Sequence, residues 1–240
     1  MCFNISINKE SKELEERFDA SFENNDDFEK IYHVSAVASP SLPVLTSDEP
    51  SKFRFYNWGL IPHWVQSREQ ADDLRLKTVN ARAESVFDKP SFREPIKSKR
   101  CLVIADGFFE WREVGGKNYP YYIKLKNNDA FAFAGIWDEW RNKNDVTRSF
   151  SIITTEANPL LAKIHNKKKR MPVMLEDERR WLEKDLDREE ITSMLKPYDQ
   201  DKMRAYPVRR LITEDVEDDV PEILVPHEYQ ALKFRQKTLF

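Results

Sequence analysis

The sequence predicts an α+β fold with an antiparallel, barrel-like β core and surrounding helices. Residues 100–155 contain five apolar segments rich in β-branched and aromatic residues, separated by short turns. Short turns join antiparallel neighbours, whereas parallel strands need long crossover connections. The helical patterns lie outside this stretch, between residues 11 and 22 and after residue 157. Helices are therefore expected to pack around a central antiparallel sheet.

The N-terminal quarter of the chain combines short extended segments with one amphipathic helix. A strand is expected at residues 2–7. A helix is expected over residues 11–22, because apolar side chains recur on one face at Leu14, Phe18 and Phe22. Residues 31–65 are predicted to be extended, since strand-like segments there are separated by prolines.

The β core itself is expected to be a meander. Its turns contain Gly115-Gly116, Asn127-Asn128 and residues 141–145, which are residue types that favour tight reversals. The expected strands are CLVIA (101–105), FFEWREV (108–114), YYIKL (121–125), AFAFAGIW (130–137) and SFSIITT (149–155).

Three helices are expected after the β core, over residues 158–165, 177–184 and 188–195. Asn158 and Pro159 suit the N-cap and first position of the first of these helices, and Asp187 with Glu190 has the spacing of a capping box. The tail after Pro207 is irregular and acidic. Because no repeat or linker is visible, residues 1–240 are expected to form a single domain.

Composition indicates a folded, soluble chain. Charged residues make up 34% and apolar residues 40%, and no apolar run approaches the roughly 18 residues that a membrane span needs. The first ten residues lack the pattern of a secretion signal. The two cysteines, Cys2 and Cys101, suggest neither a disulfide scaffold nor a zinc site, so reduced thiols and a cytoplasmic location are expected, with no metal or other cofactor. Cys101 lies in an apolar strand and is expected to be an inert core thiol.

The charge distribution restricts any contact with nucleic acid to local patches. The net charge of −3 excludes a globally basic nucleic-acid binder. Residues 163–170 (KIHNKKKR) nevertheless contain five cations and no anion, and residues 93–100 contain four cations and one Glu. Such runs are compatible with a basic groove, although a solvated charged surface is the more common explanation.

Cys2 has the most distinctive chemistry in the sequence. If Met1 is removed, Cys2 carries a free α-amine beside its thiol, and a 1,2-aminothiol condenses with an aldehyde to an imine and then to a thiazolidine ring. The two groups ordinarily titrate at about 7.7–8.0 and about 8.5, so modest help from neighbours would activate either. The alternative is that a cysteine at position 2 has no special role.

Two titratable residues are candidates for proton transfer, each with a structural alternative. Glu110 is flanked by Phe109 and Trp111, so it is either a carboxylate in an apolar site with a raised pKa or a water-facing residue of an alternating strand. His165 is predicted at the last turn of a helix, where the helix dipole favours the imidazolium, and it is either catalytic or a simple cap.

Further candidates could contact DNA. Asn80 and Arg82 are either an ordinary helix start or ligands for a carbonyl oxygen and a phosphate. Trp64 is either a core residue or an aromatic surface for stacking bases.

Taken together, the motifs resemble the SRAP family, the SOS-response-associated peptidase fold, whose members shield abasic sites in single-stranded DNA. The matching segments run in family order from Cys2 to Val173, and residues 174–240 carry no functional motif. The segments are Cys2, WGLIPHW (58–64), VNARAE (79–84), RCLVIADGFFEW (100–111), AGIWDEW (134–140), SIITTEAN (151–158) and IHNKKKRMPV (164–173).

The resemblance implies roles for individual residues. Cys2 would crosslink to the ring-opened abasic sugar as a thiazolidine, after a release of Met1 that the family name suggests is autoproteolytic. Glu110 would orient the α-amine and assist proton transfer, His165 would open the sugar ring and assist reversal of the crosslink, and Asn80 would lie beside the crosslink. The expected contacts with DNA are Trp64 as a wedge, Thr154 beside the abasic nucleotide, and Arg82 and Arg170 on phosphates.

Two departures from the family pattern are visible. The family often begins Cys-Gly-Arg, whereas Phe3 and Asn4 follow Cys2 here, so a phosphate-binding arginine is missing beside the nucleophile. Residues 166–169 also make the spacing between His165 and Arg170 longer than the one residue that is usual in the family, and the extra lysines could replace the missing charge.

The resemblance therefore predicts a monomeric enzyme that crosslinks to abasic single-stranded DNA, with weak abasic-site lyase chemistry as a side reaction, and that associates with the nucleoid if it is bacterial. Two other functions remain open. The first is an N-terminal-nucleophile amidohydrolase or cysteine peptidase, with the Cys2 thiolate as nucleophile and His165 as base. The second is a non-catalytic module that binds single-stranded DNA through Trp64 and the basic runs.

Overall fold

Five strands of the protein close into a β barrel in the computed structural model, which describes residues 2–23, 28–143, 145–210 and 219–233. Around the barrel, β10 pairs with β4, β4 with β3, β3 with β6, β6 with β9, and β9 with β10 again. This confirms the α+β class and the barrel-like core. The strands are β3 (Ser41–Thr46), β4 (Arg54–Trp58), β6 (Arg100–Ala105), β9 (Phe131–Asn142) and β10 (Asp145–Glu156).

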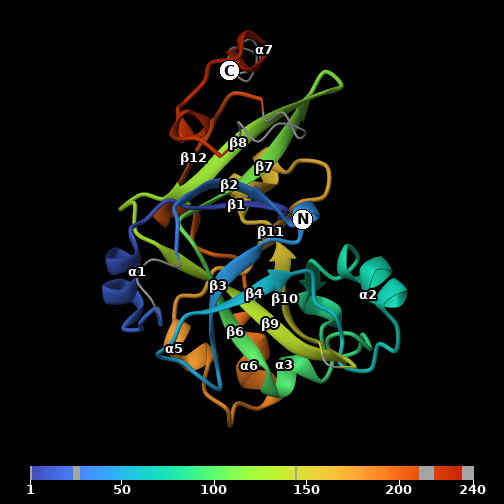
Figure 1. The fold of residues 1–240 in the computed structure, drawn as a ribbon. Helices are drawn as coiled ribbons and strands as arrows, with labels where there is room; N and C mark the ends of the chain where they lie inside the picture. The colour runs from blue at the N-terminus through green and yellow to red at the C-terminus, as the bar shows by residue number, and fades with distance from the viewer. Residues whose placement is uncertain (1, 24–27, 144, 211–218, 234–240) are drawn as a thin grey trace.

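A second, entirely antiparallel sheet has the strand order β12-β8-β7-β1-β2 and lies above the barrel in Figure 1. Its hairpin between β7 and β8 turns at Gly115 and Gly116, whose φ angles of 60° and 76° suit the expected tight turn. Its strands are β1 (Asn4–Ile7), β2 (Ile31–Ser35), β7 (Gly107–Val114), β8 (Lys117–Leu125) and β12 (Met203–Pro207).

The expectation of one continuous meander is therefore wrong. β7 and β8 leave the barrel for the second sheet, and β3 and β4 take their place between β6 and β10. The chain crosses between the sheets at Asp106 and Gly107, where an added Cβ on Gly107 would lie 2.2 Å from the Tyr122 ring. Two pairings are also parallel, because β10 runs beside β4 and then beside β5 (Asn80–Arg82). On its other edge β10 pairs with β9 and then β11 (Arg170–Pro172).

Short helices surround the sheets, as expected, but most end earlier than predicted. The first helix, α1 (Ser11–Phe18), ends where Asp19 takes a left-handed conformation with φ 50°, so the predicted end at Phe22 is wrong. The capping box at Asp187 and Glu190 is present. The other helices are α2 (Arg68–Arg75), α3 (Pro95–Ser98), α4 (Pro159–Ile164), α5 (Glu178–Trp181), α6 (Arg188–Met194) and α7 (Gln230–Lys233). No helix among the described residues is long and apolar enough to cross a membrane.

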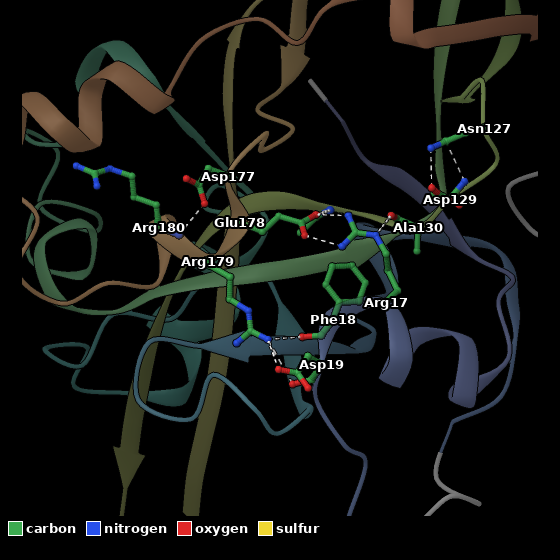
Figure 2. Close-up of polar contacts among 11 residues, drawn as sticks. Arg17, Phe18, Asp19, Asn127, Asp129, Ala130, Asp177, Glu178, Arg179 and Arg180 are labelled. Carbon is green, nitrogen blue, oxygen red and sulfur yellow. Dashed lines mark hydrogen bonds and ion pairs between the residues drawn. The ribbon is translucent and has the colours of Figure 1, made fainter.

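Helix α5 ties the C-terminal part of the chain to α1 through the pairs that Figure 2 shows, here called the α1–α5 clamp. Arg17 donates two hydrogen bonds to the Glu178 carboxylate, at 2.9 and 3.0 Å, and a third to the carbonyl of Ala130. Arg179 donates to the Asp19 carboxylate and to the Phe18 carbonyl at the end of α1, both at 3.0 Å. Residues beyond 173 therefore hold the fold together although they carry no site motif.

Candidate active site

Cys2 lies two residues before β1, a strand of the second sheet. Strand β1 lies between β2 and β7, and the carbonyl of Phe3 accepts a hydrogen bond from the Ala36 N–H at 2.8 Å. The Cys2 side chain is fully buried, and its thiol contacts the carbonyl of Asn4 at 3.8 Å. Burial raises the pKa of the Cys2 thiol well above its usual range, and the nearby Glu110 carboxylate raises it further. The buried thiol therefore holds its proton more tightly than a free cysteine does, and Glu110 does not activate it.

Asn80 lies directly beside Cys2. It sits on β5, opposite Ile152 of β10, so the parallel pairing fixes its place. Its amide Nδ2 donates a hydrogen bond to the carbonyl of Cys2 at 2.8 Å. Its Oδ1 is buried and accepts no hydrogen bond from any residue in the described part of the chain. Since buried acceptors are rarely left without a donor, this atom suits a donor that arrives with the substrate or with the released α-amine.

Glu110 is buried on β7, so the water-facing alternative is wrong. Residues 107–110 are all buried rather than alternating, because β7 is covered on both of its faces: Phe108 packs in the main core and Phe109 in a separate apolar cluster. The exposed fraction of Glu110 is 3%. Desolvation by this burial raises the pKa of Glu110 to about 7. A carboxyl group with that pKa can both give and take a proton near neutral pH.

His165 follows the last residue of α4 and faces Glu110. Its Nδ1 lies 2.9 Å from the carbonyl oxygen of Arg170 and 3.6 Å from Glu110 Oε1. A carbonyl only accepts, so Nδ1 carries the proton and Nε2 carries the lone pair of the neutral ring. Burial lowers the pKa of His165 to about 4. The prediction that the helix dipole would favour the imidazolium is therefore wrong, because α4 has only six residues and desolvation outweighs its dipole.

The structure thus brings four predicted residues together from four separate elements. Asn80 contacts Cys2, the Glu110 charge acts on the Cys2 thiol, and His165 faces Glu110. Between about pH 4 and pH 7, His165 is therefore largely neutral and Glu110 is largely protonated. No group of three or more His, Cys, Asp or Glu in the described ranges is arranged to hold a metal ion.

The candidate DNA contacts differ in how available they are. Thr154 is buried on β10, and its hydroxyl donates to the carbonyl of Ala81 at 3.4 Å. Arg170 pairs with both carboxylate oxygens of Glu84 and donates to the Thr154 carbonyl at 2.6 Å. Arg82 is exposed, and its side chain makes no hydrogen bond or ion pair with any described residue. Arg82 therefore offers a more available cation than Arg170, whose ion pair with Glu84 was not predicted from the sequence.

The two tryptophans of WGLIPHW differ in burial. Trp58 is fully buried, stacks against Phe150 and donates to the Val79 carbonyl at 2.9 Å, so it is a core residue. Trp64 is 41% exposed, which leaves its ring available for stacking. Sequence reasoning missed the neighbouring Asp138, a buried carboxylate that fixes this segment by accepting from the His63 N–H at 2.8 Å.

Phe3 and Asn4 both make contacts within the protein. Phe3 packs against the core, and Asn4 is buried with its Oδ1 3.0 Å from Nε2 of His33. Position 4 therefore makes an internal contact and does not reach outward as an arginine would.

The chain therefore combines a closed barrel with a candidate site in which a cysteine at position 2 lies beside Asn80 and near a buried glutamate and a neutral histidine. The chain belongs to the family described as SOS response associated peptidase (SRAP), which matches residues 1–215. This confirms the resemblance drawn from the motifs.

Relatives and solved structures agree with that assignment. Abasic site processing protein YoqW of Bacillus subtilis is 37% identical over 237 residues, which are 95% of this chain and all of that protein. Abasic site processing protein HMCES of Gallus gallus is 30% identical over 196 residues, covering 71% of this chain and 56% of that protein. A crystal structure of a protein from Bacteroides thetaiotaomicron has a TM-score of 0.89 at 40% identity, covering 95% of this chain and all of that one.

Proposed function

We propose that this protein recognises abasic sites in single-stranded DNA and forms a covalent thiazolidine crosslink through Cys2 after Met1 is removed. The observation that carries the proposal is the group of four buried residues: Asn80 donates to the Cys2 carbonyl, the charge of Glu110 acts on the Cys2 thiol, and His165 faces Glu110. Relatives named abasic site processing proteins support the same substrate. No step in the proposed reaction needs a metal or a diffusible cofactor.

The first step opens the abasic sugar. A closed sugar hides its aldehyde, so a base must take the proton of the C1′ hydroxyl while an acid protonates the ring oxygen. His165 suits the base, because its neutral Nε2 carries a lone pair. Glu110 suits the acid, because its pKa of about 7 leaves much of it protonated near neutral pH.

The amine of Cys2 attacks before the thiol. The α-nitrogen adds to the aldehyde carbon, and loss of one water gives an imine. The buried thiol is protonated until then. Protonation of the imine nitrogen places a positive charge beside the thiol, which lowers its pKa and draws the sulfur to the same carbon. The C–S bond forms, the thiol proton is released to a neighbouring base, and the nitrogen remains as an amine in the ring.

Ring closure also protects the strand. An imine acidifies the neighbouring sugar carbon, so β-elimination would break the DNA if the imine persisted. Converting the imine to a thiazolidine removes that electron sink. By microscopic reversibility, residues that assist formation of the crosslink also assist its reversal, and Glu110 and His165 would have this role.

The remaining residues would position the strand. Trp64 is exposed enough to stack beneath a base, which is worth about 1–3 kcal/mol for each stacked base, and Arg82 has a cation available for a phosphate. Arg170 and Thr154 would shape the wall of the site, because their polar groups already bond within the protein. A monomer suffices for this arrangement, in which residues 1–240 act as one domain.

A gel assay tests the proposal against the two other functions. The protein is mixed with single-stranded DNA bearing one abasic site, and the expected product is a heat-stable protein–DNA adduct that Cys2→Ala abolishes. Intact mass first establishes that Met1 is absent. If processed wild type forms no adduct, or if Cys2→Ala retains it, the crosslinking function is wrong. Reversible binding without an adduct would identify a plain DNA-binding module, and the raised pKa of the Cys2 thiol already disfavours a thiolate peptidase.

A further inference from the structure

The segment Asn166–Lys169 interrupts the site between two of its residues. It follows His165 directly and precedes Arg170, and it contains Lys167, Lys168 and Lys169 in a row. All four of its residues are exposed. Three adjacent lysines at this place could be equivalent solvated cations, but their surroundings make them different.

Both ends of the segment are fixed to the protein. Asn166 bonds twice to the backbone of Glu113 on β7, accepting from its N–H at 3.1 Å and donating to its carbonyl at 2.9 Å. At the other end, the Lys169 N–H donates to the His165 carbonyl at 2.8 Å, and its own carbonyl accepts from Ala157 at 3.0 Å. The position of the segment relative to Glu110 and His165 is therefore set by the fold.

The three lysines have different electrostatic partners. Lys167 forms an ion pair with Glu113, so its charge is already neutralised within the protein. Neither Lys168 nor Lys169 forms a side-chain hydrogen bond or ion pair with a described residue. Burial dominates the pKa values of both Glu110 and His165, raising the first to about 7 and lowering the second to about 4, and the charge of Lys168 lowers each of them. Lys168 is the lysine of the three whose charge reaches the site.

We propose that Lys168 is a phosphate-binding residue that grips the backbone of the strand at the abasic nucleotide. An exposed ammonium without an anionic partner, fixed beside a site for a polyanion, is suited to bind a phosphate. The contact gives the site a local cation near Glu110 and His165 on a chain whose net charge is −3, in which Asn4 is turned inward. The inference rests on the proposed function and names one contact within it.

The test measures reversible binding, so that it does not depend on Cys2 chemistry. The probe is a fluorescent single-stranded oligonucleotide with one tetrahydrofuran residue, an abasic analogue that has no aldehyde and cannot crosslink. Kd is measured by anisotropy at several NaCl concentrations for wild type, Lys168→Gln and Lys168→Arg. The matched control is Lys169→Gln, which removes an exposed and unbonded lysine from the next position.

Lys168→Gln is expected to weaken binding about 3- to 10-fold at low salt and to reduce the slope of log Kd against log [NaCl] by about 0.7, the value for one phosphate contact with a single strand. Lys168→Arg should retain the wild-type slope, and Lys169→Gln should change Kd less than twofold. Equal effects of the two glutamine variants, or an unchanged slope in Lys168→Gln, would overturn the proposal.

The two proposals fail in different ways. If true abasic DNA gives no adduct with processed protein while Lys168→Gln still changes the salt slope, the crosslinking function is wrong and the phosphate contact remains. If the adduct forms on Cys2 and the salt slope is unchanged in Lys168→Gln, only the phosphate contact is wrong.

Discussion

Glu178 in the α1–α5 clamp and Glu110 in the candidate active site are the same residue type in opposite electrostatic settings. Glu178 accepts two hydrogen bonds from Arg17 and a third from the Ala132 N–H, so its negative charge is stabilised where it stands. Glu110 is almost completely buried, and its surroundings raise its pKa to about 7. Glu178 serves to join α1 to α5 through hydrogen bonds, whereas Glu110 has a pKa at which it can exchange a proton near neutral pH.

The comparison shows how the fold divides stability from chemistry. Charge-assisted hydrogen bonds such as those of the clamp stabilise the folded state. A buried titratable group that has been shifted toward neutral pH destabilises it, and such groups concentrate where proton transfer is needed. Replacing each glutamate by glutamine should therefore have opposite consequences. Glu110→Gln should lower the rate of adduct formation, whereas Glu178→Gln should lower stability.

The largest effect is expected for Glu110→Gln. Glutamine keeps the shape of the side chain but cannot transfer a proton, so the single-turnover rate of adduct formation on abasic single-stranded DNA should fall by about 10²- to 10³-fold. The Tm at pH 8 should stay the same or rise, because a buried ionisable group has been replaced by a neutral one. A rate within threefold of wild type would remove Glu110 from the mechanism.

A smaller loss of rate is expected for His165→Gln. The neutral imidazole is assigned to sugar opening, a step that also proceeds slowly without a catalyst in solution, so the rate of adduct formation should fall about 10- to 100-fold. The matched experiment supplies an already open aldehyde, such as glyoxylate, and follows its condensation with Cys2 by intact mass. That condensation should be nearly unchanged in His165→Gln, and an equal loss with both substrates would argue against a role in ring opening.

At the clamp, Glu178→Gln should affect stability and leave the chemistry unchanged. Loss of the charge-assisted pair with Arg17 should lower the free energy of unfolding by about 1–2 kcal/mol, since the pair is bidentate but partly exposed. Urea titration measures that change. The adduct rate of the folded variant should match wild type, and a large loss of rate would show that the two regions are coupled.

The smallest expected effect is on the pH dependence of the Tm. The pKa of Glu110 is raised in the folded state, so its contribution to stability is fully present below its unfolded pKa of about 4.5 and is lost as pH rises through about 7. The Tm of wild type relative to Glu110→Gln should therefore be lower at pH 8 than at pH 5. The pKa of His165 in the folded wild type, about 4, lies below the pH range compared. A pH-independent difference would mean that Glu110 has an ordinary pKa.

Sequence patterns predicted the class of fold but not which strands adjoin. The apolar segments between residues 100 and 155 are all strands, yet β7 and β8 leave the barrel, because nothing local distinguishes a turn within one sheet from a crossing between two. The parallel pairing that places Asn80 beside Cys2 joins residues far apart in the chain. The left-handed Asp19 also ended α1 within a pattern that continued to Phe22.

The four residues that the structure brings together were predicted from the sequence, but the protonation states of two of them were not. Motif order identified Cys2, Asn80, Glu110 and His165, and an apolar flank correctly suggested a raised pKa for Glu110. The neutral state of His165 and the protonated thiol of Cys2 depend on burial by distant segments, which local sequence does not specify. The same limit applies to Arg170, whose partner Glu84 lies 86 residues away.

The central claim is that the α-amine and the thiol of Cys2 bond to the same sugar carbon. The most direct test is mass spectrometry of the protease-digested adduct, prepared without borohydride from processed protein and abasic single-stranded DNA. The predicted product is an N-terminal peptide that begins at Cys2 and carries the ring-opened sugar with the loss of one water. Because a thiazolidine is not an imine, treatment with borohydride should leave its mass unchanged. An adduct on a lysine such as Lys168, an adduct on a chain that retains Met1, or a gain of two hydrogens with borohydride would contradict the account.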